Sequence, residues 1–158
     1  MARPPALDWS TDNCSVARTL DVIGEKWTLV VLREVFQGVR RFEDMRVRTG
    51  IPRQVLSDRL AHLVEDQILY REAYREPGQR ERHEYRLTAK GIDLHPVLLA
   101  LMTWGDTYAA DPDGVPLEIH HRDCGASAFL ELRCSAGHGQ LTARDVRPTP
   151  GPAARLRA

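Results

Sequence analysis

The stretch from residue 51 to residue 91 constrains the fold of this chain more than any other part of its sequence. Its first half carries apolar side chains at helical spacing, and Pro52 stands where the first turn of a helix tolerates proline. These apolar residues are Leu56, Leu60 and Leu63. Polar residues such as Gln54 and Ser57 occupy the opposite face. The pattern predicts an amphipathic helix that ends near Asp66.

A hairpin is predicted directly after this helix. Residues 69–75 and 82–87 have the composition of β-strands, and the Pro77-Gly78 pair between them is typical of a turn. Arginines flank the turn on both sides. A helix followed by a basic two-stranded hairpin is an arrangement in which the helix enters a DNA groove and the hairpin contacts the flanking backbone.

The segments on either side complete a mainly helical domain. Apolar spacing predicts three short helices upstream, over residues 16–23, 26–36 and 41–47. Downstream it predicts a long helix that Thr88 caps and Pro96 kinks or divides. The predicted fold class is mainly α with a small β wing (α+β), a winged helix-turn-helix with a short β-rich C-terminal extension. The predicted core aromatics, some of which could instead line a small effector pocket, are Trp27, Phe42, Tyr85 and Trp104.

Composition divides the chain into four parts. Residues 1–13 are expected to be disordered, and residues 14–110 form the predicted winged helix-turn-helix domain. Three strand-like runs follow a proline- and glycine-containing linker, over residues 117–121, 128–134 and 140–146. Residues 111–147 are therefore expected to form a small β-rich extension, for which a zinc-ribbon-like hairpin is one candidate structure. The proline- and arginine-rich residues 148–158 are expected to fray.

The chain balances 22 basic against 22 acidic residues, so any basic patch for nucleic acid must be local. Residues 33–59 carry such a surplus, with seven arginines against four acidic residues. The sequence has no apolar run of about 18 residues. Its first residues lack the apolar core of a signal peptide, so a cytoplasmic location is expected. In that compartment the three cysteines are expected to be packing residues, reactive thiols or metal ligands rather than disulfides.

The polar helix face and the hairpin supply candidate contacts to double-stranded DNA. The candidates on the helix, facing base edges or phosphates of the major groove, are Arg53, Gln54, Ser57 and Asp58. The candidates for phosphate or minor-groove contacts are Arg75, Arg80 and Arg82 of the hairpin and Arg41 at the start of the third helix. The alternative interpretation is a solvated helix face beside an ordinary charged hairpin.

Cys14 lies at the start of the first predicted helix, where the helix dipole favours a thiolate. Arg18, one turn further on, could strengthen that effect. A reactive, redox-sensing thiol is one interpretation of Cys14. A small buried residue is the other, because free cysteine is commonly buried.

The other two cysteines each have a histidine nearby, in the patterns His121-x-x-Cys124 and Cys134-x-x-x-His138. Two sulfurs and two imidazoles could complete a tetrahedral structural zinc site. A full zinc ribbon would have a further cysteine at Gly137. A metal-free hairpin and a Cys124–Cys134 disulfide formed under oxidation are the alternatives.

Several separate motifs occur in an order that resembles a known family. They are Cys14-Ser15-Val16, the run from Leu20 to Trp27, Arg41-Phe42, the run from Leu56 to Leu63, the run from Tyr85 to Gly91, and Trp104. Over about residues 14–108 the chain resembles the HxlR-type winged helix-turn-helix regulators, which are bacterial relatives of the MarR group. Two positions depart from the family pattern. Gln67 replaces the usual glycine after the recognition helix, so that turn is expected to be strained or shaped differently. Pro52 replaces the usual polar capping residue, which removes one side-chain cap and one expected phosphate contact.

The resemblance implies a homodimeric transcription factor that binds a pseudo-palindromic operator. The terminal helices would form the dimer interface, through Val16, Leu20, Leu98, Leu101 and Met102. In several such regulators the cysteine that corresponds to Cys14 senses oxidants, electrophiles or aldehydes.

The predicted function is therefore a dimeric, sequence-specific DNA-binding regulator that represses transcription and responds to oxidants, electrophiles or a small-molecule effector. One rival is an interaction adaptor that keeps the fold without binding DNA. The other rival is a thiol enzyme that uses Cys14. The sequence disfavours an enzyme because it shows no paired base, no glycine-rich phosphate loop and no oxyanion signature.

Overall fold

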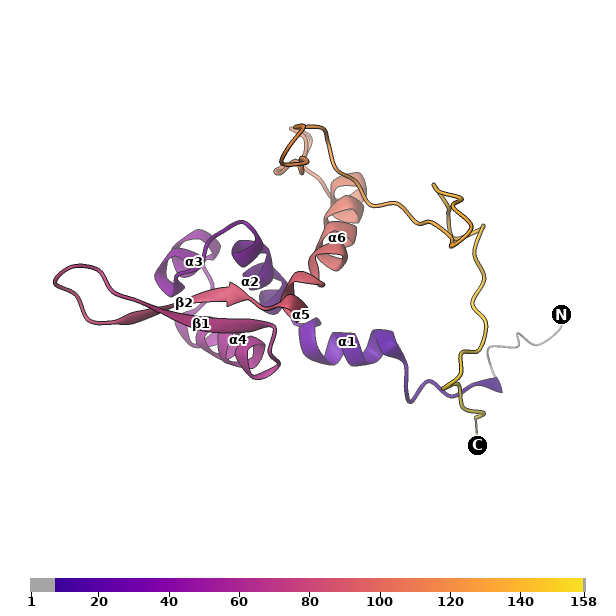
Figure 1. The fold of residues 1–158 in the computed structure, drawn as a ribbon, viewed down its shortest axis with the longest axis horizontal. Helices are drawn as coiled ribbons and strands as arrows, with labels where there is room; N and C mark the ends of the chain where they lie inside the picture. The colour runs from indigo at the N-terminus through magenta and orange to yellow at the C-terminus, as the bar shows by residue number, and fades with distance from the viewer. Residues whose placement is uncertain (1–7, 158) are drawn as a thin grey trace.

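The computed structural model describes residues 8–157 of the chain. Its elements follow one another as α1 (Ser15–Ile23), α2 (Lys26–Phe36), α3 (Phe42–Thr49), α4 (Arg53–Glu65), β1 (Leu69–Tyr74), β2 (Arg82–Leu87), α5 (Ala89–Ile92) and α6 (His95–Tyr108). The two strands form an antiparallel sheet. This is the mainly helical winged fold that the sequence predicts (Figure 1). No helix among the described residues is long and apolar enough to cross a membrane.

The core lies where α2 packs against α4 and the base of the hairpin. The leucine stripe of α4 is buried there, with Leu56 and Leu60 at 0% exposure and Leu63 at 1%. Leu32 of α2 and Met45 of α3 complete this part of the core. Each buried leucine side chain contributes about 1.5–3 kcal/mol by leaving water. The burial of the leucine stripe turns the polar face of α4 toward solvent.

The turn after α4 places Gln67 in a backbone conformation that is unfavourable for a residue other than glycine. Gln67 has a φ of 58°, in the left-handed region that favours glycine. At the other end of the helix, Pro52 stands just before α4, which has no side-chain cap at its N-terminus. Both departures from the family pattern therefore have visible structural consequences.

The long helix predicted after β2 is divided into two. Thr88 Oγ1 accepts a hydrogen bond of 3.0 Å from the backbone N–H of Gly91, which caps the short helix α5. The helix α6 then starts at His95, with Pro96 in its first turn. Proline marks the break, as predicted, because its ring and missing N–H exclude it from a helix interior.

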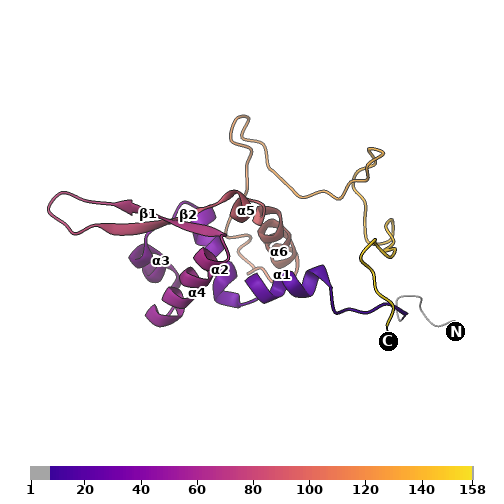
Figure 2. The same ribbon diagram turned by 60° about the horizontal axis from the view of Figure 1, so that its bottom comes forward.

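The two strands pair from Leu69 opposite Leu87 at the base to Tyr74 opposite Arg82 near the tip. Together with residues 75–81 they form a hairpin, here called the wing, which projects beyond the helices (Figures 1 and 2). Burial does not alternate along β2, where His83 is exposed while the next four residues are half-buried. Only the base of this two-stranded sheet has helices to pack against, so the outer part is solvated on both faces.

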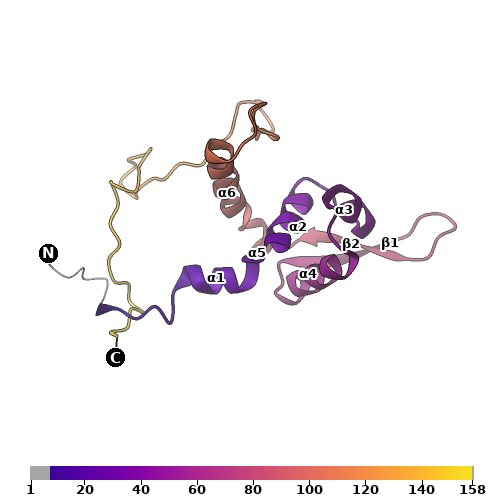
Figure 3. The ribbon, with the colours of Figure 1, turned by 180° about the vertical axis from the view of Figure 1, so that it is seen from behind.

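Residues 111–157, here called the arm, contain no β-strand and therefore differ from the predicted β-rich extension. They leave the end of α6, form short turns and return toward α1 (Figures 1 and 3). Alternating apolar residues need a sheet face to cover them, and the arm offers none, so that Phe129 is 79% exposed. Of the segment expected to be disordered, residues 1–7 lie outside the described residues. Trp9, in its described part, forms a β-bridge with Leu156 of the tail that was expected to fray.

Candidate nucleic-acid interface

The exposed face at the start of α4 carries the residues that the sequence analysis assigned to DNA. Arg53, Gln54 and Ser57 are exposed, and Asp58 is half-buried. Gln54 Nε2 donates a hydrogen bond of 2.8 Å to Asp58 Oδ1. Asp58 therefore holds the amide of Gln54 in one orientation. Arg53, Gln54 and Ser57 present polar side chains to solvent at the start of the helix.

Arg53 is held by a carboxylate that the sequence did not reveal as its partner. Its guanidinium Nη1 donates to Glu43 Oε1 of α3 over 2.6 Å, and the guanidinium carbon lies 5.1 Å from the centre of the Phe42 ring. Arg46 Nε donates to the other oxygen of Glu43 at 2.8 Å. The hydrogen bonds from Arg46 and then Arg53 lower the pKa of Glu43, so this carboxylate remains charged beside the candidate DNA-binding helix.

The wing carries the three predicted arginines on exposed positions. Arg75 Nε donates to the carbonyl oxygen of Gln79 at 3.2 Å, which orders the loop. Arg80 and Arg82 are exposed, and no ion pair within the described residues engages them. Their charges are therefore free to meet phosphates.

Arg41 immediately precedes α3 and joins it to the outer part of the wing. Its Nη1 donates to Glu76 Oε1 at 2.7 Å, and its guanidinium stacks 4.2 Å from the centre of the Tyr74 ring. The backbone N–H of Tyr85 also donates to Arg40 O at 2.8 Å. Arg41 therefore fixes the position of the wing, a structural role that the sequence analysis did not anticipate for a phosphate candidate.

An ion cluster centred on the buried Glu34 joins α2 to α3. Glu34 of α2 is 0% exposed, and its two oxygens accept hydrogen bonds of 2.6 Å from Arg33 Nη2 and Arg48 Nε. Burial raises the pKa of Glu34, but the hydrogen bonds from Arg48 and Arg33 outweigh it, and the net shift is downward. Arg48 thereby ties α3 to α2. The sequence showed only a run of mixed charges here.

Cys14 immediately precedes α1 and is half-buried. Its side chain makes no capping hydrogen bond to the helix. The guanidinium of Arg18 donates to the carbonyl oxygen of Asn13 at 3.1 Å, next to Cys14 in the chain. The thiol is thus neither fully exposed nor sealed in the core.

The residues assigned to a dimer interface fall into two groups. Val16, Leu20 and Leu101 are exposed by 67%, 55% and 50%, and they line an open apolar groove between α1 and α6. Leu98 and Met102 are half-buried, and Leu98 packs against the core of its own chain.

The prediction that Trp104 is a core residue is wrong, since its side chain is 63% exposed on α6. The remaining three predicted core aromatics, Trp27, Phe42 and Tyr85, pack partly buried against the core.

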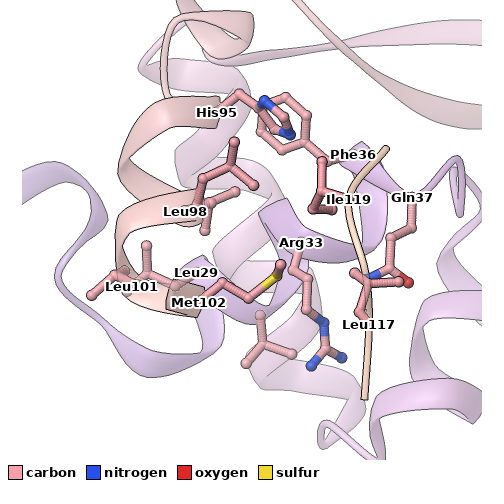
Figure 4. A pocket seen from close by; sticks show the side chains of 12 residues that line it. Leu29, Arg33, Phe36, Gln37, His95, Leu98, Leu101, Met102, Leu117 and Ile119 are labelled. Atoms are coloured by element: carbon pink, nitrogen blue, oxygen red, sulfur yellow. The ribbon is translucent and has the colours of Figure 1, made fainter. Parts of the chain in front are cut away.

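A second cavity of about 310 Å³ lies between α2, α6 and the start of the arm (Figure 4). Its walls are mostly apolar, with His95 toward one end and Arg33 toward the other. The ring of His95 lies 4.7 Å from the ring of Phe36. Leu117 and Ile119 of the arm form one wall. This is the candidate pocket for a small-molecule effector, and Arg33, Gln37 and His95 are its polar side chains.

The four residues of the predicted zinc site are brought together as two separate pairs. His121 Nδ1 lies 3.2 Å from Cys124 Sγ, and Cys134 Sγ lies 3.2 Å from His138 Nδ1. No group of three or more potential metal ligands occurs within residues 8–157. A four-ligand site is therefore not formed in this arrangement of the arm.

An exposed helix beside a basic hairpin, both held on a small helical core, defines a winged helix-turn-helix protein. Residues 22–113 match the sequence model of the HxlR-like helix-turn-helix family. This chain belongs to the HxlR-like helix-turn-helix family and is a transcriptional regulator with a DNA-binding domain.

The chain is similar along most of its length to other regulators. It is 47% identical over 138 residues to an uncharacterised HTH-type transcriptional regulator of Mycobacterium tuberculosis, and the match covers 87% of this chain and 86% of that protein. The crystal structure of PA1607, a candidate transcription factor, superposes with a TM-score of 0.76 at 35% identity over 89% of this chain and 96% of that one. The redox regulator HypR, in its reduced form, superposes with a TM-score of 0.52 at 32% identity over 58% of this chain and 90% of that one.

Proposed function

We propose that this regulator binds a pseudo-palindromic operator as a homodimer and represses transcription there. The observation that carries the proposal is the exposed start of α4, where Arg53, Gln54 and Ser57 lie beside α3. In a two-fold dimer, two such helices enter major grooves about 34 Å apart, and the wings contact the flanking backbone. Repression is the expected mode because a dimer on promoter DNA excludes the polymerase.

The chemistry of the exposed side chains supports base recognition rather than backbone contact alone. A guanidinium can bind a guanine edge through two hydrogen bonds, and an amide can bind an adenine edge in the same way, each worth about 1–3 kcal/mol of discrimination. Arg53 carries the guanidinium and Gln54 the amide at the start of α4. Asp58 would act by orienting Gln54, to which it is already hydrogen-bonded.

The groove between α1 and α6 supports the homodimer. Val16, Leu20 and Leu101 expose apolar side chains along it, and Trp104 and Tyr108 extend the same kind of surface along α6. Exposed apolar surface of this kind marks an interaction site. A second copy brings the same helices in a self-complementary arrangement, as a two-fold interface requires.

The DNA-binding proposal can be tested by selecting bound sequences from random DNA and measuring affinity for the selected site. The double substitution Arg53→Ala with Gln54→Ala is expected to weaken binding at least about tenfold. The matched control is His62→Ala, which removes an exposed side chain from the far end of the same helix and should bind like the wild type. Unchanged affinity of the double variant would overturn the assignment of α4.

We further propose that oxidation of Cys14 is one signal that releases the operator. The half-buried thiol at the start of α1 and the similarity to the redox regulator HypR support this step. Hydrogen peroxide would convert the thiol to a sulfenic acid with release of water. Peroxide should then weaken operator binding by the wild type and by Cys124→Ser, but not by Cys14→Ser. A response that survives in Cys14→Ser would contradict the proposal.

A small apolar ligand in the pocket between α2 and α6 is the second proposed signal. Because α6 forms one wall of the pocket and part of the apolar groove, a ligand there would change the position of a dimer helix. Met102→Trp should fill the pocket. A compound that raises the melting temperature of the wild type should therefore have no effect on this variant.

A further inference from the structure

Two turns of the arm are built on the same plan. In the first, residues 119–128 double back through a bridge between His120 and Ser127 and a hydrogen bond of 2.8 Å from His121 N to Ala126 O. In the second, residues 132–141 double back through hydrogen bonds from Cys134 N to His138 O and from Leu141 N to Leu132 O. Each turn therefore forms locally, within about ten residues.

Each turn holds one thiol against one imidazole. Sγ of Cys124 lies 3.2 Å from Nδ1 of His121, and Sγ of Cys134 lies 3.2 Å from Nδ1 of His138. A glycine with positive φ shapes each turn, Gly125 at 71° and Gly137 at 90°. The backbone N–H of each glycine donates to the carbonyl oxygen of the first residue of its pair, at 2.9 and 3.0 Å. Both turns thus present a nitrogen and a sulfur donor side by side.

These donor pairs have the spacing and chemistry of half a tetrahedral zinc site. Zn–S and Zn–N bonds of about 2.3 and 2.1 Å at a tetrahedral angle place the two ligand atoms roughly 3.6 Å apart, close to the observed separation. Both pairs are exposed, so they are accessible to a metal ion. Oδ2 of Asp123 lies 3.9 Å from Nε2 of His121, on the side of the ring away from the sulfur. A carboxylate near the second nitrogen is the usual way in which a ligating histidine is oriented.

The part of the arm that carries the two turns has no apolar core of its own to stabilise it. From residue 120 to residue 138 every residue is exposed, including Phe129 and Leu132. A module of this size cannot bury enough apolar surface to hold itself together and ordinarily depends on a metal, a disulfide or a partner. Two turns that each carry two zinc-type ligands favour the metal among these three.

We propose that the two turns are halves of one structural Zn²⁺ site, completed when the connecting residues 129–131 bend and bring His121 and Cys124 against Cys134 and His138. All four ligands come from one chain, because only three residues separate the two turns and hairpin connections of that length are common. Two thiols lose their protons to solvent on binding, so the bound site of two thiolates, two neutral imidazoles and Zn²⁺ is electrically neutral. The closed arm then presents Phe129 and Leu132 on a fixed module.

The test uses the full-length reduced protein with Zn²⁺, and with Co²⁺ as a spectroscopic probe. The expected result is one Zn²⁺ per chain by native mass spectrometry, and a Co²⁺ complex with thiolate charge-transfer and tetrahedral d–d absorption. Cys124→Ser, Cys134→Ser, His121→Ala and His138→Ala should each lower metal affinity by roughly a hundredfold or more. The matched controls, Cys14→Ser and His62→Ala, replace a cysteine and a histidine outside the arm and should bind metal like the wild type. Helical circular dichroism should be unchanged in the four arm variants, because the substituted side chains are exposed and lie outside the helices.

Three results would overturn the proposal. The first is the absence of stoichiometric metal on protein that is fully reduced. The second is metal binding that survives the loss of Cys124 or Cys134, or that disappears in Cys14→Ser. The third is one Zn²⁺ for every two chains, which would show that the ligands come from different copies. None of these measurements depends on DNA binding. A failure of the proposed metal site can therefore be distinguished from a failure of the proposed DNA-binding function.

Discussion

Arg53, the first residue of α4, is bound to Glu43 of α3 through Nη1 and Oε1 atoms that lie 2.6 Å apart. This contact holds the most exposed arginine of the candidate recognition helix in place before any DNA arrives. It also means that Arg53 must exchange a carboxylate for a base edge or a phosphate. Glu43 therefore acts both as a positioning group and as a competitor.

Replacing Glu43 with glutamine should strengthen operator binding by about two- to fivefold at low salt, because it frees Arg53 and removes a negative charge close to the phosphates. Fluorescence anisotropy with the selected operator would measure this change. Glu65→Gln, an exposed glutamate at the other end of α4, is the matched control and should change affinity less. Weaker binding by Glu43→Gln would show that positioning of Arg53 matters more than competition.

The wing and α4 should differ in what their loss does to recognition. Arg80→Ala and Arg82→Ala should weaken binding to all sequences equally and lower the salt slope of log K by about one each, since their charges are free to meet phosphates. Gln54→Ala should instead relax the preference at one base position. Affinities for the operator and for single-base variants, measured over a range of salt concentrations, would separate the two effects. A change of base preference in Arg80→Ala would contradict this division.

The buried carboxylate of Glu34 should make stability depend on pH in the acid range. Its pKa lies below the usual 4.5 in the folded chain because Arg48 and Arg33 hydrogen bonds outweigh burial. A carboxyl with a lowered folded pKa stabilises the fold above its unfolded pKa, and that stabilisation is lost as pH falls through the folded pKa. Urea unfolding of the wild type should therefore show decreasing stability below about pH 4.5, and Glu34→Gln should show a flatter profile there. Parallel profiles for the two proteins would refute the role of this group.

The apolar groove should control the oligomeric state. Leu101→Glu places a charge on a side chain that is 50% exposed between α1 and α6, so it should dissociate a dimer without unfolding the helical core. Sedimentation velocity would compare it with Val47→Glu, an exposed apolar residue on α3 away from the groove. A dimer that persists in Leu101→Glu would place the interface elsewhere.

The elements that depend on local patterns could be predicted from the sequence. The stripe of Leu56, Leu60 and Leu63 located α4, and the Pro77-Gly78 turn located the wing, because helical spacing and turn residues act within a few positions. Gln67 also indicated its own strained turn. These features supply most of the surface that is assigned to DNA.

The partners of the arginines could not be predicted, because they depend on how helices pack. Nothing in the sequence indicated that Arg53 would meet Glu43, ten positions earlier, or that Arg41 would meet Glu76 across the wing. In the arm, by contrast, the sequence pattern predicted strands that the structure does not contain. Its alternating residues had the local pattern of strands, but a strand needs a continuous ladder with a neighbour. Residues 128–134 make only isolated backbone hydrogen bonds and form no strand.

Leu117 and Ile119 are at once the beginning of the arm and one wall of the cavity on α2 and α6. The cavity and the first residues of the arm therefore share two side chains, so a change in the position of Leu117 and Ile119 alters both. A ligand that displaces these two side chains would also move the residues of the arm that follow them. A movement of the arm at this point would in turn change the shape of the cavity. For the proposed effector, the consequence of binding would therefore be visible far along the chain from the pocket itself.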